Sequence, residues 1–297
     1  MPPRTPSAVT RPRHASLPQA RFAWRLLLLL LLACPLAVAK AEEKPDDKWQ
    51  VSLTPSYTSG DYGQGSTTTV IYVPLSFQRL FRDGDISFVV PWVSVTGDCS
   101  VTLLSGVPNQ TGSQCGAPHP QRGRKKRTST PDPIVTNSGL GDLVLRGRYY
   151  MLDEGGGLPE VAVTARLKIP TAEADKGLGT GEFDEGFGIE VTRTLLGNWV
   201  GFVDAGYTFI GKPPGIDLRN QWYYDVGLGY NLTKDLTASM YYEEWRALLD
   251  GFQNPQDLLF SLSYTHTPAV RMNLSTQIGL SDGAPSYGLT GGVSLRF

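Results

Sequence analysis

Charged side chains recur at alternate positions through the second half of the chain, and their type and spacing make them the first candidates for function. Each lies in a segment where polar residues occupy one face and apolar residues the other. Ionisable groups are costly at membrane depth unless they are paired or hydrated, so this pattern is typical of a barrel interior. The candidate lumen-lining residues are Asp142, Arg146, Arg148, Arg166, Lys168, Glu190, Asp204, Asp225 and Glu243, and Asp257 and Arg271 lie on the same face.

The expected strand register gives these groups specific partners. A turn centred on Gly155 places Asp142 opposite Lys168. A turn centred on Gly197 places Glu190 opposite Asp204. Like charges on facing positions repel, unless a cation such as Arg166 reaches across from a neighbouring strand. Two interpretations remain open and are compatible: an ion-pair network that stiffens or plugs a narrow barrel, or a polar constriction with a basic wall facing an acidic one.

Other chemistry has little support in the sequence. A hydrolase needs a serine, a histidine and an orienting third group, whereas His14, His119 and His266 fall in the leader, in a long loop and beside a turn. We expect no catalytic residues, no metal site and no cofactor. Cys99 and Cys115 form an even pair in a Pro-, Gly- and Ser-rich segment, which predicts a disulfide in an oxidising compartment.

The elements that position these residues are predicted to be strands. Apolar and polar residues alternate with a period of two, as on a half-exposed strand, and no helical period of useful length appears. The strands run longer than the ~5–6 residues usual in a soluble sandwich. We expect twelve of them, at residues 48–58, 66–78, 85–97, 139–152, 158–170, 182–195, 198–211, 219–231, 235–246, 257–266, 270–281 and 286–297.

The connections between these segments alternate between short and mostly longer ones, and the longest runs from Asp98 to Ser138. Short periplasmic turns, long external loops and an even strand number are typical of outer-membrane barrels. Aromatic residues such as Trp49, Trp199 and Tyr287 cluster at strand ends on the apolar face, as a bilayer interface favours. The fold class is therefore all-β: a transmembrane antiparallel up-and-down barrel over residues 48–297.

The first 39 residues are typical of an export signal. Arg21 and Arg25 precede a short apolar run that ends in Ala37-Val38-Ala39, a small-residue cleavage site. Processing as a lipoprotein at Cys34 is the alternative. Residues 40–47 then form a short periplasmic segment. The remaining 258 residues hold 22 basic and 28 acidic side chains, and this acidic balance argues against nucleic acid as a partner.

Two features point to partners in and around the outer membrane. Phe297 ends the chain on an alternating strand and resembles the signal by which the outer-membrane assembly machinery recognises its substrates. The basic residues at 122–127 lie in the long external loop, where they suit the phosphate groups of lipopolysaccharide. These observations place the protein in the outer membrane of a Gram-negative bacterium, in contact with outer-membrane lipids.

Short Gly-rich motifs also carry a family resemblance. Ser138-Gly-Leu-Gly-Asp142, Lys168-Ile-Pro-Thr171 and Gly177-Leu-Gly-Thr-Gly181 resemble a family of outer-membrane barrel proteins assigned to a meta-cleavage (MetA) pathway of phenol degradation and often labelled transporters. The match is clearest over residues 138–231. Ala172 stands where the family prefers glycine, and the loop holding Cys99 and Cys115 looks like an insertion. The resemblance implies uptake of small molecules, including aromatic ones.

The sequence thus predicts a passive pore or transporter for small molecules, not an enzyme. The alternative is a structural or surface-interaction barrel whose lumen is closed and whose 98–138 loop performs the function. The pore or transporter would have a small-molecule solute as its partner, whereas the structural barrel would act through its external loop.

Overall fold

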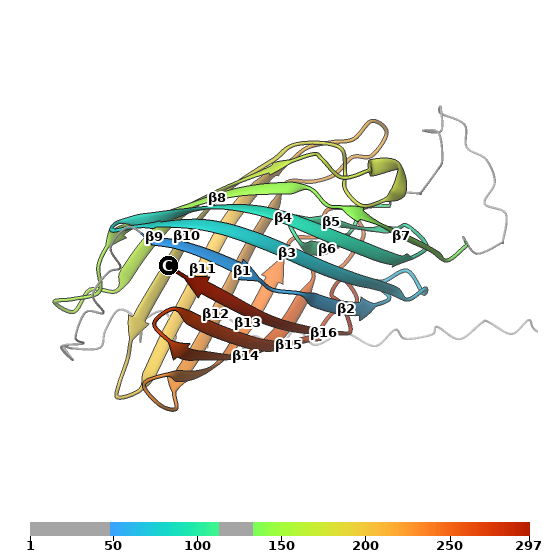
Figure 1. Cartoon of the computed structure of the whole chain (residues 1–297). Coiled ribbons are helices and arrows are strands. Elements are labelled where there is room, and N and C mark those ends of the chain that lie inside the picture. The colour runs from blue at the N-terminus through green and yellow to red at the C-terminus, as the bar shows by residue number, and fades with distance from the viewer. Residues whose placement is uncertain (1–47, 113–132) are drawn as a thin grey trace, which may run out of the picture.

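A computed structural model describes residues 48–112 and 133–297 of the chain (Figure 1). The predicted export signal, the segment 40–47, Cys115 and the basic run at 122–127 lie outside the described residues. The described chain is almost entirely β-structure. Its one helix is the three-residue 3₁₀ turn η1 (Ala174–Lys176), and no helix in these ranges is long and apolar enough to cross a membrane.

The main sheet closes on itself, because β1 pairs with both β3 and the final strand β16. All pairings in it are antiparallel. Its segments are β1 (Lys48–Leu53), β2 (Ser56–Gly60), β3 (Thr68–Phe81), β4 (Gly84–Gly97), β7 (Val135–Leu140), β8 (Leu143–Leu152), β9 (Glu160–Ile169), β10 (Asp184–Thr194), β11 (Trp199–Ile210), β12 (Gln221–Asn231), β13 (Leu236–Trp245), β14 (Gln256–Thr267), β15 (Val270–Gly279) and β16 (Tyr287–Arg296).

Two of the barrel strands are interrupted. β1 and β2 flank Thr54-Pro55 and both pair with β3 and β16, and proline has no N–H to donate to the ladder. β7 and β8 flank Gly141-Asp142 and both pair with β4. Each pair therefore forms one interrupted strand, and the predicted closed barrel of twelve antiparallel strands is confirmed.

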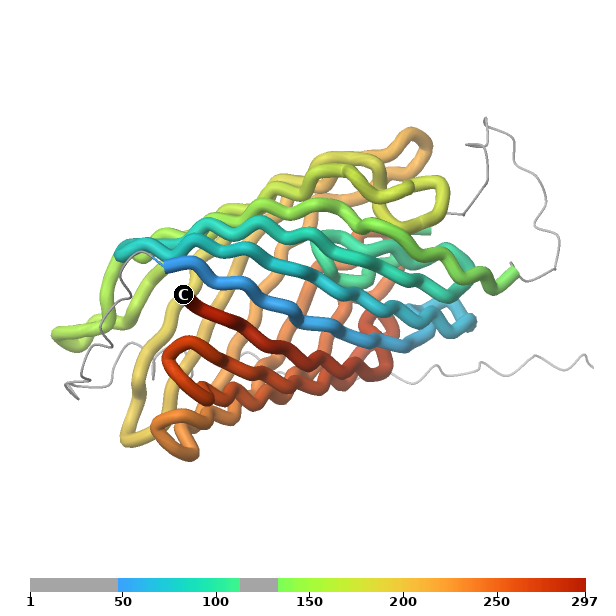
Figure 2. The backbone as a smooth tube through the Cα atoms, in the orientation of Figure 1, coloured from blue at the N-terminus to red at the C-terminus, as the bar shows by residue number. Residues whose placement is uncertain are grey.

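Short turns gather at one end of the barrel and longer connections at the other (Figure 2). The short end holds, for example, the two-residue links 82–83 and 268–269. There Trp49, near the start of β1, and Phe297 are joined by two backbone hydrogen bonds of 2.9 Å. Longer links such as 170–183 and 246–255 lie at the opposite end. By the usual arrangement of outer-membrane barrels, the short end is periplasmic and the long end external.

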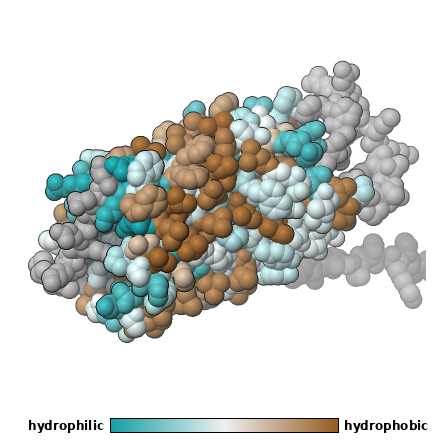
Figure 3. Space-filling view, in the orientation of Figure 1, coloured by the Kyte–Doolittle hydropathy of each residue, from teal (hydrophilic) through white to brown (hydrophobic). Residues whose placement is uncertain are grey.

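The outer face of the barrel is apolar. On β15, Met272, Leu274 and Ile278 are 46%, 51% and 48% exposed, whereas the residues between them are polar. A broad apolar band crosses the middle of the molecule, with hydrophilic surface near the ends (Figure 3). Soluble monomers rarely expose a contiguous apolar patch above a few hundred Å². The band therefore has the character of a lipid-facing surface.

The long connection after β4 does not stay wholly outside, a point on which the sequence of 98–138 makes no prediction. It begins with a separate hairpin formed by β5 (Val101–Leu104) and β6 (Val107–Gln110). Eight of the residues from 101 to 111 are less than 10% exposed: Val101, Thr102, Leu103, Leu104, Ser105, Asn109, Gln110 and Thr111. The hairpin is buried because it packs against inward-facing barrel residues.

Candidate functional site

A cavity of about 470 Å³ occupies the barrel interior beside the tip of the β5–β6 hairpin. Ser105 and Val107 of the hairpin contribute to its lining, and Gln78 and Asp85 line it towards the periplasmic end. Most of the remaining lining residues are polar or charged, including Ser52, Ser76, Ser87, Ser294, Arg146, Arg148, Arg166, Glu190, Asp204 and Asp225. A polar cavity of this size inside a barrel of intermediate width can hold a small hydrated solute.

Two apolar clusters hold the hairpin in the lumen. Leu103 packs in a buried cluster that includes Val70 and Val93 of the barrel wall. Leu104 packs in a second cluster with Ile210, Leu218 and Leu248. Both leucines are only 4% exposed. Burying a leucine side chain stabilises it by about 1.5–3 kcal/mol relative to water, so the docked position is strongly favoured.

The hairpin turn fits closely against the wall. Ser105 and Gly106 have φ of 52° and 93°, the positive values that a two-residue hairpin turn of type I′ requires. A side chain on Gly106 would place its Cβ 2.8 Å from the ring of Tyr72. Farther along, Gln221 donates a 2.9 Å hydrogen bond to the side chain of Asn109. Glycine is therefore needed both for the turn and for the approach to β3.

Asp98 caps the start of this connection. Its carboxylate accepts hydrogen bonds from the Ser100 backbone N–H at 3.0 Å, from the Ser100 hydroxyl at 2.5 Å and from the Ser66 hydroxyl at 2.7 Å. Partial burial raises the pKa of Asp98, but these hydrogen bonds outweigh burial and leave the pKa below its ordinary value. The ionised form therefore fixes the chain where it turns into the lumen.

Carboxylates form a continuous row across five neighbouring strands. Glu190 is the pairing partner of Asp204, and the predicted register between β10 and β11 is confirmed. The row then continues through directly paired positions on β12, β13 and β14: Asp204 with Asp225, Asp225 with Glu243, and Glu243 with Asp257. The hydrogen-bonded rows of a tilted barrel spiral around its axis, so this row climbs towards the external end, where Asp257 is 2% exposed.

Basic residues occupy the adjoining strands β8 and β9. Arg148 lies 2.9 Å from Glu190 and 3.6 Å from Asp85. The cation in direct contact with the Glu190–Asp204 pair is thus Arg148, whereas Arg166, the example that the sequence offered, forms no ion pair with either carboxylate. Arg166 instead donates a 2.9 Å hydrogen bond to Thr208. The interior accordingly has a basic side on β8 and β9 and an acidic side on the following strands.

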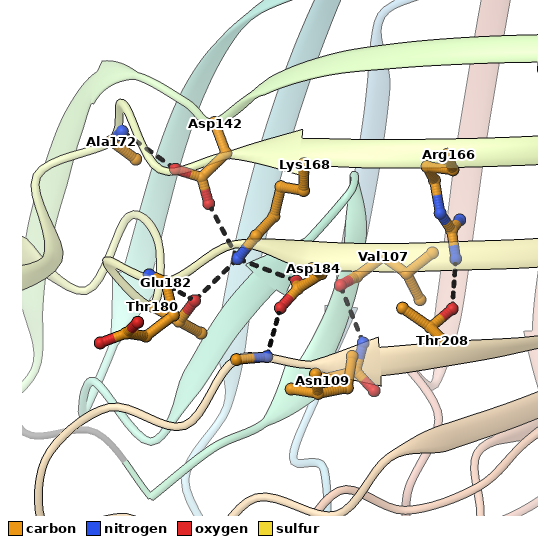
Figure 4. A network of polar contacts seen from close by, with 12 residues as sticks. Val107, Asn109, Asp142, Arg166, Lys168, Ala172, Thr180, Glu182, Asp184 and Thr208 are labelled. Atoms are coloured by element: carbon orange, nitrogen blue, oxygen red, sulfur yellow. Dashed lines mark hydrogen bonds and ion pairs between the residues drawn. The ribbon is translucent and has the colours of Figure 1, made fainter.

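Lys168 lies in a sealed ion-pair cluster and not on the cavity wall (Figure 4). Its side chain is 0% exposed, and its Nζ lies 2.9 Å from Asp184, 3.3 Å from Asp142 and 2.7 Å from the Thr180 hydroxyl. The other oxygen of Asp142 accepts hydrogen bonds from two backbone N–H groups of the 170–183 loop. This cluster anchors the external loop to β8, β9 and β10.

The expected register between β8 and β9 is wrong by two positions. Lys168 pairs with Val144, and Asp142 reaches the lysine diagonally. The tight turn consists of Gly156 and Gly157, both with positive φ, so its centre lies beyond Gly155. An irregularity between Tyr150 and Leu152 then takes back one position of this shift. The contact between the two charged groups is nevertheless made, because a lysine side chain spans the diagonal.

The remaining candidate residues occupy identifiable positions. Six of the nine candidate lumen residues line the cavity: Arg146, Arg148, Arg166, Glu190, Asp204 and Asp225. Glu243 continues the acidic row outside that lining. Cys99 is buried where the chain turns after β4, but Cys115 lies outside the described residues, so the disulfide stays a prediction. Phe297 is 72% exposed at the periplasmic end, and its role in assembly also stays a prediction.

Sequence reasoning missed an aromatic pair in the cavity wall. Tyr223 and Trp245 are pairing partners whose rings stack with centroids 4.5 Å apart and planes 19° from parallel. Tyr223 lies across Gly206, where an added Cβ would come within 2.4 Å of its ring. The alternation of β11, β12 and β13 puts Gly206, Tyr223 and Trp245 on the inward face. The sequence signal was a glycine at an inward position beside an aromatic residue on the next strand.

The closed barrel, its apolar outer band and its polar interior together define an outer-membrane β-barrel protein. Within that class, the chain belongs to the family described as "Putative MetA-pathway of phenol degradation", whose sequence profile matches residues 51–297. The resemblance noted from the Gly-rich motifs is therefore confirmed. No curated protein sequence matches the chain.

Solved structures share this architecture. The COG4313 outer membrane channel from Pseudomonas putida F1 has 11% sequence identity and a TM-score of 0.66, covering 89% of this chain and 100% of the channel. The P. putida toluene transporter TodX has 11% identity and a TM-score of 0.44, covering 90% of this chain and 92% of the transporter. At this identity the first likeness identifies the fold.

Proposed function

We propose that the protein is a passive outer-membrane channel for small solutes, with the β5–β6 hairpin closing its external side. The observation that carries the proposal is the polar cavity between the hairpin and the periplasmic end. A purely structural barrel of this width can fill its interior with its own side chains. Here charged and hydroxyl side chains surround open space, so the interior is suited to a hydrated solute.

The family assignment supports small aromatic molecules as one class of solute, since its description refers to phenol degradation. The outer-membrane channel from P. putida supports the same general role through its shared fold. Diffusion through a lumen needs no cofactor and no catalytic group. We further propose that lipid covers the apolar band, and that Phe297 is recognised by the assembly machinery.

A liposome-swelling experiment tests the proposal. The mature protein is reconstituted into vesicles, and the swelling rate is measured in isotonic solutions of small neutral solutes such as glycerol and arabinose. A variant in which residues 101–110 are replaced by a short Gly-Ser linker serves as the opened barrel. We expect slow swelling with the wild type and fast swelling with the variant. A folded, reconstituted variant that does not accelerate swelling would favour the structural barrel with a closed lumen.

A further inference from the structure

Two arginines stand side by side in the cavity, and the carboxylates of Asp184 and Asp204 attract Arg166 only from beyond ion-pair distance. Arg146 and Arg166 are direct pairing partners on β8 and β9. Arg146 donates only to the Ser105 carbonyl at 3.5 Å, and Arg166 donates to the Thr208 hydroxyl at 2.9 Å. In residues 48–112 and 133–297, neither guanidinium forms an ion pair. Like charges on facing positions are unfavourable, so an anion placed between them would be stabilised.

The neighbouring Arg148, in contrast, has a structural role and is paired with carboxylates. Its guanidinium is held by Glu190 and Asp85, with its closest carboxylate oxygen at 2.9 Å. Arg146, two positions along the same strand, has no such carboxylate and remains exposed to the lumen. Its hydrogen bond to the Ser105 carbonyl, at 3.5 Å, is too long to be a strong one and is readily exchanged for a better acceptor.

Glycines on β10 allow these groups to lie close to the backbone of that strand. Gly186 pairs with Arg166, and a Cβ added there would lie 3.4 Å from the Arg166 Nε. At Gly188, the next inward position, an added Cβ would lie 2.7 Å from the Tyr223 hydroxyl. The guanidinium of Arg166 and the hydroxyl of Tyr223 therefore lie over adjacent inward positions of one strand, beside the hydroxyls of Thr208 and Thr164.

An aromatic surface adjoins the arginines. Tyr223 and Trp245 stack on each other, and both line the cavity that Arg146 and Arg166 line. Aromatic rings favour offset stacking with a further ring. Asp204 and Asp225 line the same cavity beyond Tyr223 and disfavour an anion on that side. A ligand with one carboxylate and one ring thus has a single favourable orientation, with its carboxylate towards β8 and β9.

We infer that Arg146 and Arg166 bind the carboxylate of a small aromatic acid whose ring lies against Tyr223 and Trp245. Guanidinium groups match carboxylates through paired charge-assisted hydrogen bonds, and the cavity of about 470 Å³ is large enough for a single-ring acid. The inference rests on the proposed channel function and deepens it, since it names the class of solute that pauses in the lumen.

Calorimetric titration of the purified, detergent-solubilised protein with benzoate tests the inference. Cyclohexanecarboxylate, acetate and benzyl alcohol serve as comparison probes. We expect saturable benzoate binding that weakens about tenfold or more in Arg166→Gln and further in the double variant with Arg146→Gln. Arg271→Gln is the matched control, because Arg271 lines a separate recess with Pro268 and Ala269, and it should bind benzoate as the wild type does.

The probes separate the two parts of the site. Trp245→Leu should weaken benzoate severalfold and leave acetate unchanged, and cyclohexanecarboxylate should bind more weakly than benzoate to the wild type. Benzyl alcohol, which lacks the charge, should show no saturable binding. Equal benzoate affinity in the wild type and the double arginine variant would overturn the inference, as would the absence of saturable binding to the wild type.

Failure of this site is distinguishable from failure of the channel. If neutral solutes permeate vesicles holding the opened barrel while benzoate does not bind, the anion site is wrong and the channel stands. If no solute permeates, the channel is wrong whatever the titration gives.

Discussion

Loosening the β5–β6 hairpin should open the channel without unfolding the barrel. The perturbation is the double substitution Leu103→Ala and Leu104→Ala. Each leucine is 4% exposed, and the two pack in different clusters of the barrel interior. Replacing a buried leucine by alanine costs about 2–5 kcal/mol. Because the two clusters are separate, the losses should nearly add, to about 4–10 kcal/mol.

That loss of free energy is large relative to the free energy with which a ten-residue hairpin docks in the lumen. Since 1.4 kcal/mol corresponds to a factor of ten, even the lower figure raises the ratio of undocked to docked hairpin by about 10³. The main sheet keeps all its strand pairings, because β5 and β6 form a separate sheet. The barrel should therefore still fold and insert.

Single-channel recording in planar lipid bilayers measures the effect. The wild type should remain mostly at a low conductance level, and the double variant should show frequent, long openings to a higher level. Leu274→Ala, on the lipid-facing side of β15 with Leu274 51% exposed, controls for the loss of a leucine from the barrel and should resemble the wild type. A folded double variant with the wild-type open probability would refute the idea that packing of the hairpin closes the lumen.

Three further predictions follow from the charged groups. Lys168→Met leaves two buried carboxylates without their cation and should lower the free energy of unfolding in detergent by about 3–5 kcal/mol, with a matching drop in thermal stability. The control Lys234→Met, at a 90% exposed side chain, should leave thermal denaturation unchanged. Arg148→Gln removes the cation paired with Glu190, so the reversal potential of the opened barrel in a salt gradient should shift towards cation selectivity. An unchanged reversal potential would mean that Arg148 does not line the permeation path. The pKa of Asp98 is lowered in the folded protein. The stabilisation by its ionised carboxylate is therefore fully present above the ordinary aspartate pKa of about 3.9, and it is lost as the pH falls through the lower pKa of the folded state. Openings should therefore increase below about pH 4 in the wild type, and Asp98→Asn should show raised opening that no longer changes over that range.

The sequence predicted the barrel well because alternation is a local property. Each strand places apolar side chains on one face and polar side chains on the other, so the inward positions of Arg148 and Glu190 follow from parity alone. Register across a tight turn also follows where the turn is simple, as between Glu190 and Asp204. The predicted register failed at Gly156-Gly157. The backbone conformation decides which of several neighbouring glycines form the turn, and composition alone does not give it.

The hairpin in the lumen could not be found in this way. Val101–Leu104 is a short apolar run, and nothing local distinguishes a run that packs outside from one that folds into the barrel. Its position depends on Leu218 and Leu248, which lie in two other external loops far along the chain. The side-chain partner of the Glu190–Asp204 pair was missed for a related reason, since the reach of Arg148 across β9 depends on tertiary geometry.

The account depends most directly on which face of the strands meets hydrocarbon. Nitroxide labels at Leu274→Cys and Ser275→Cys, each in a background with Cys99 and Cys115 replaced by serine, sample opposite faces of β15. In reconstituted bilayers, the label at 274 should be relaxed by dissolved oxygen and shielded from a water-soluble nickel complex, and the label at 275 should show the reverse. Equal access of the nickel complex to both labels would contradict the account.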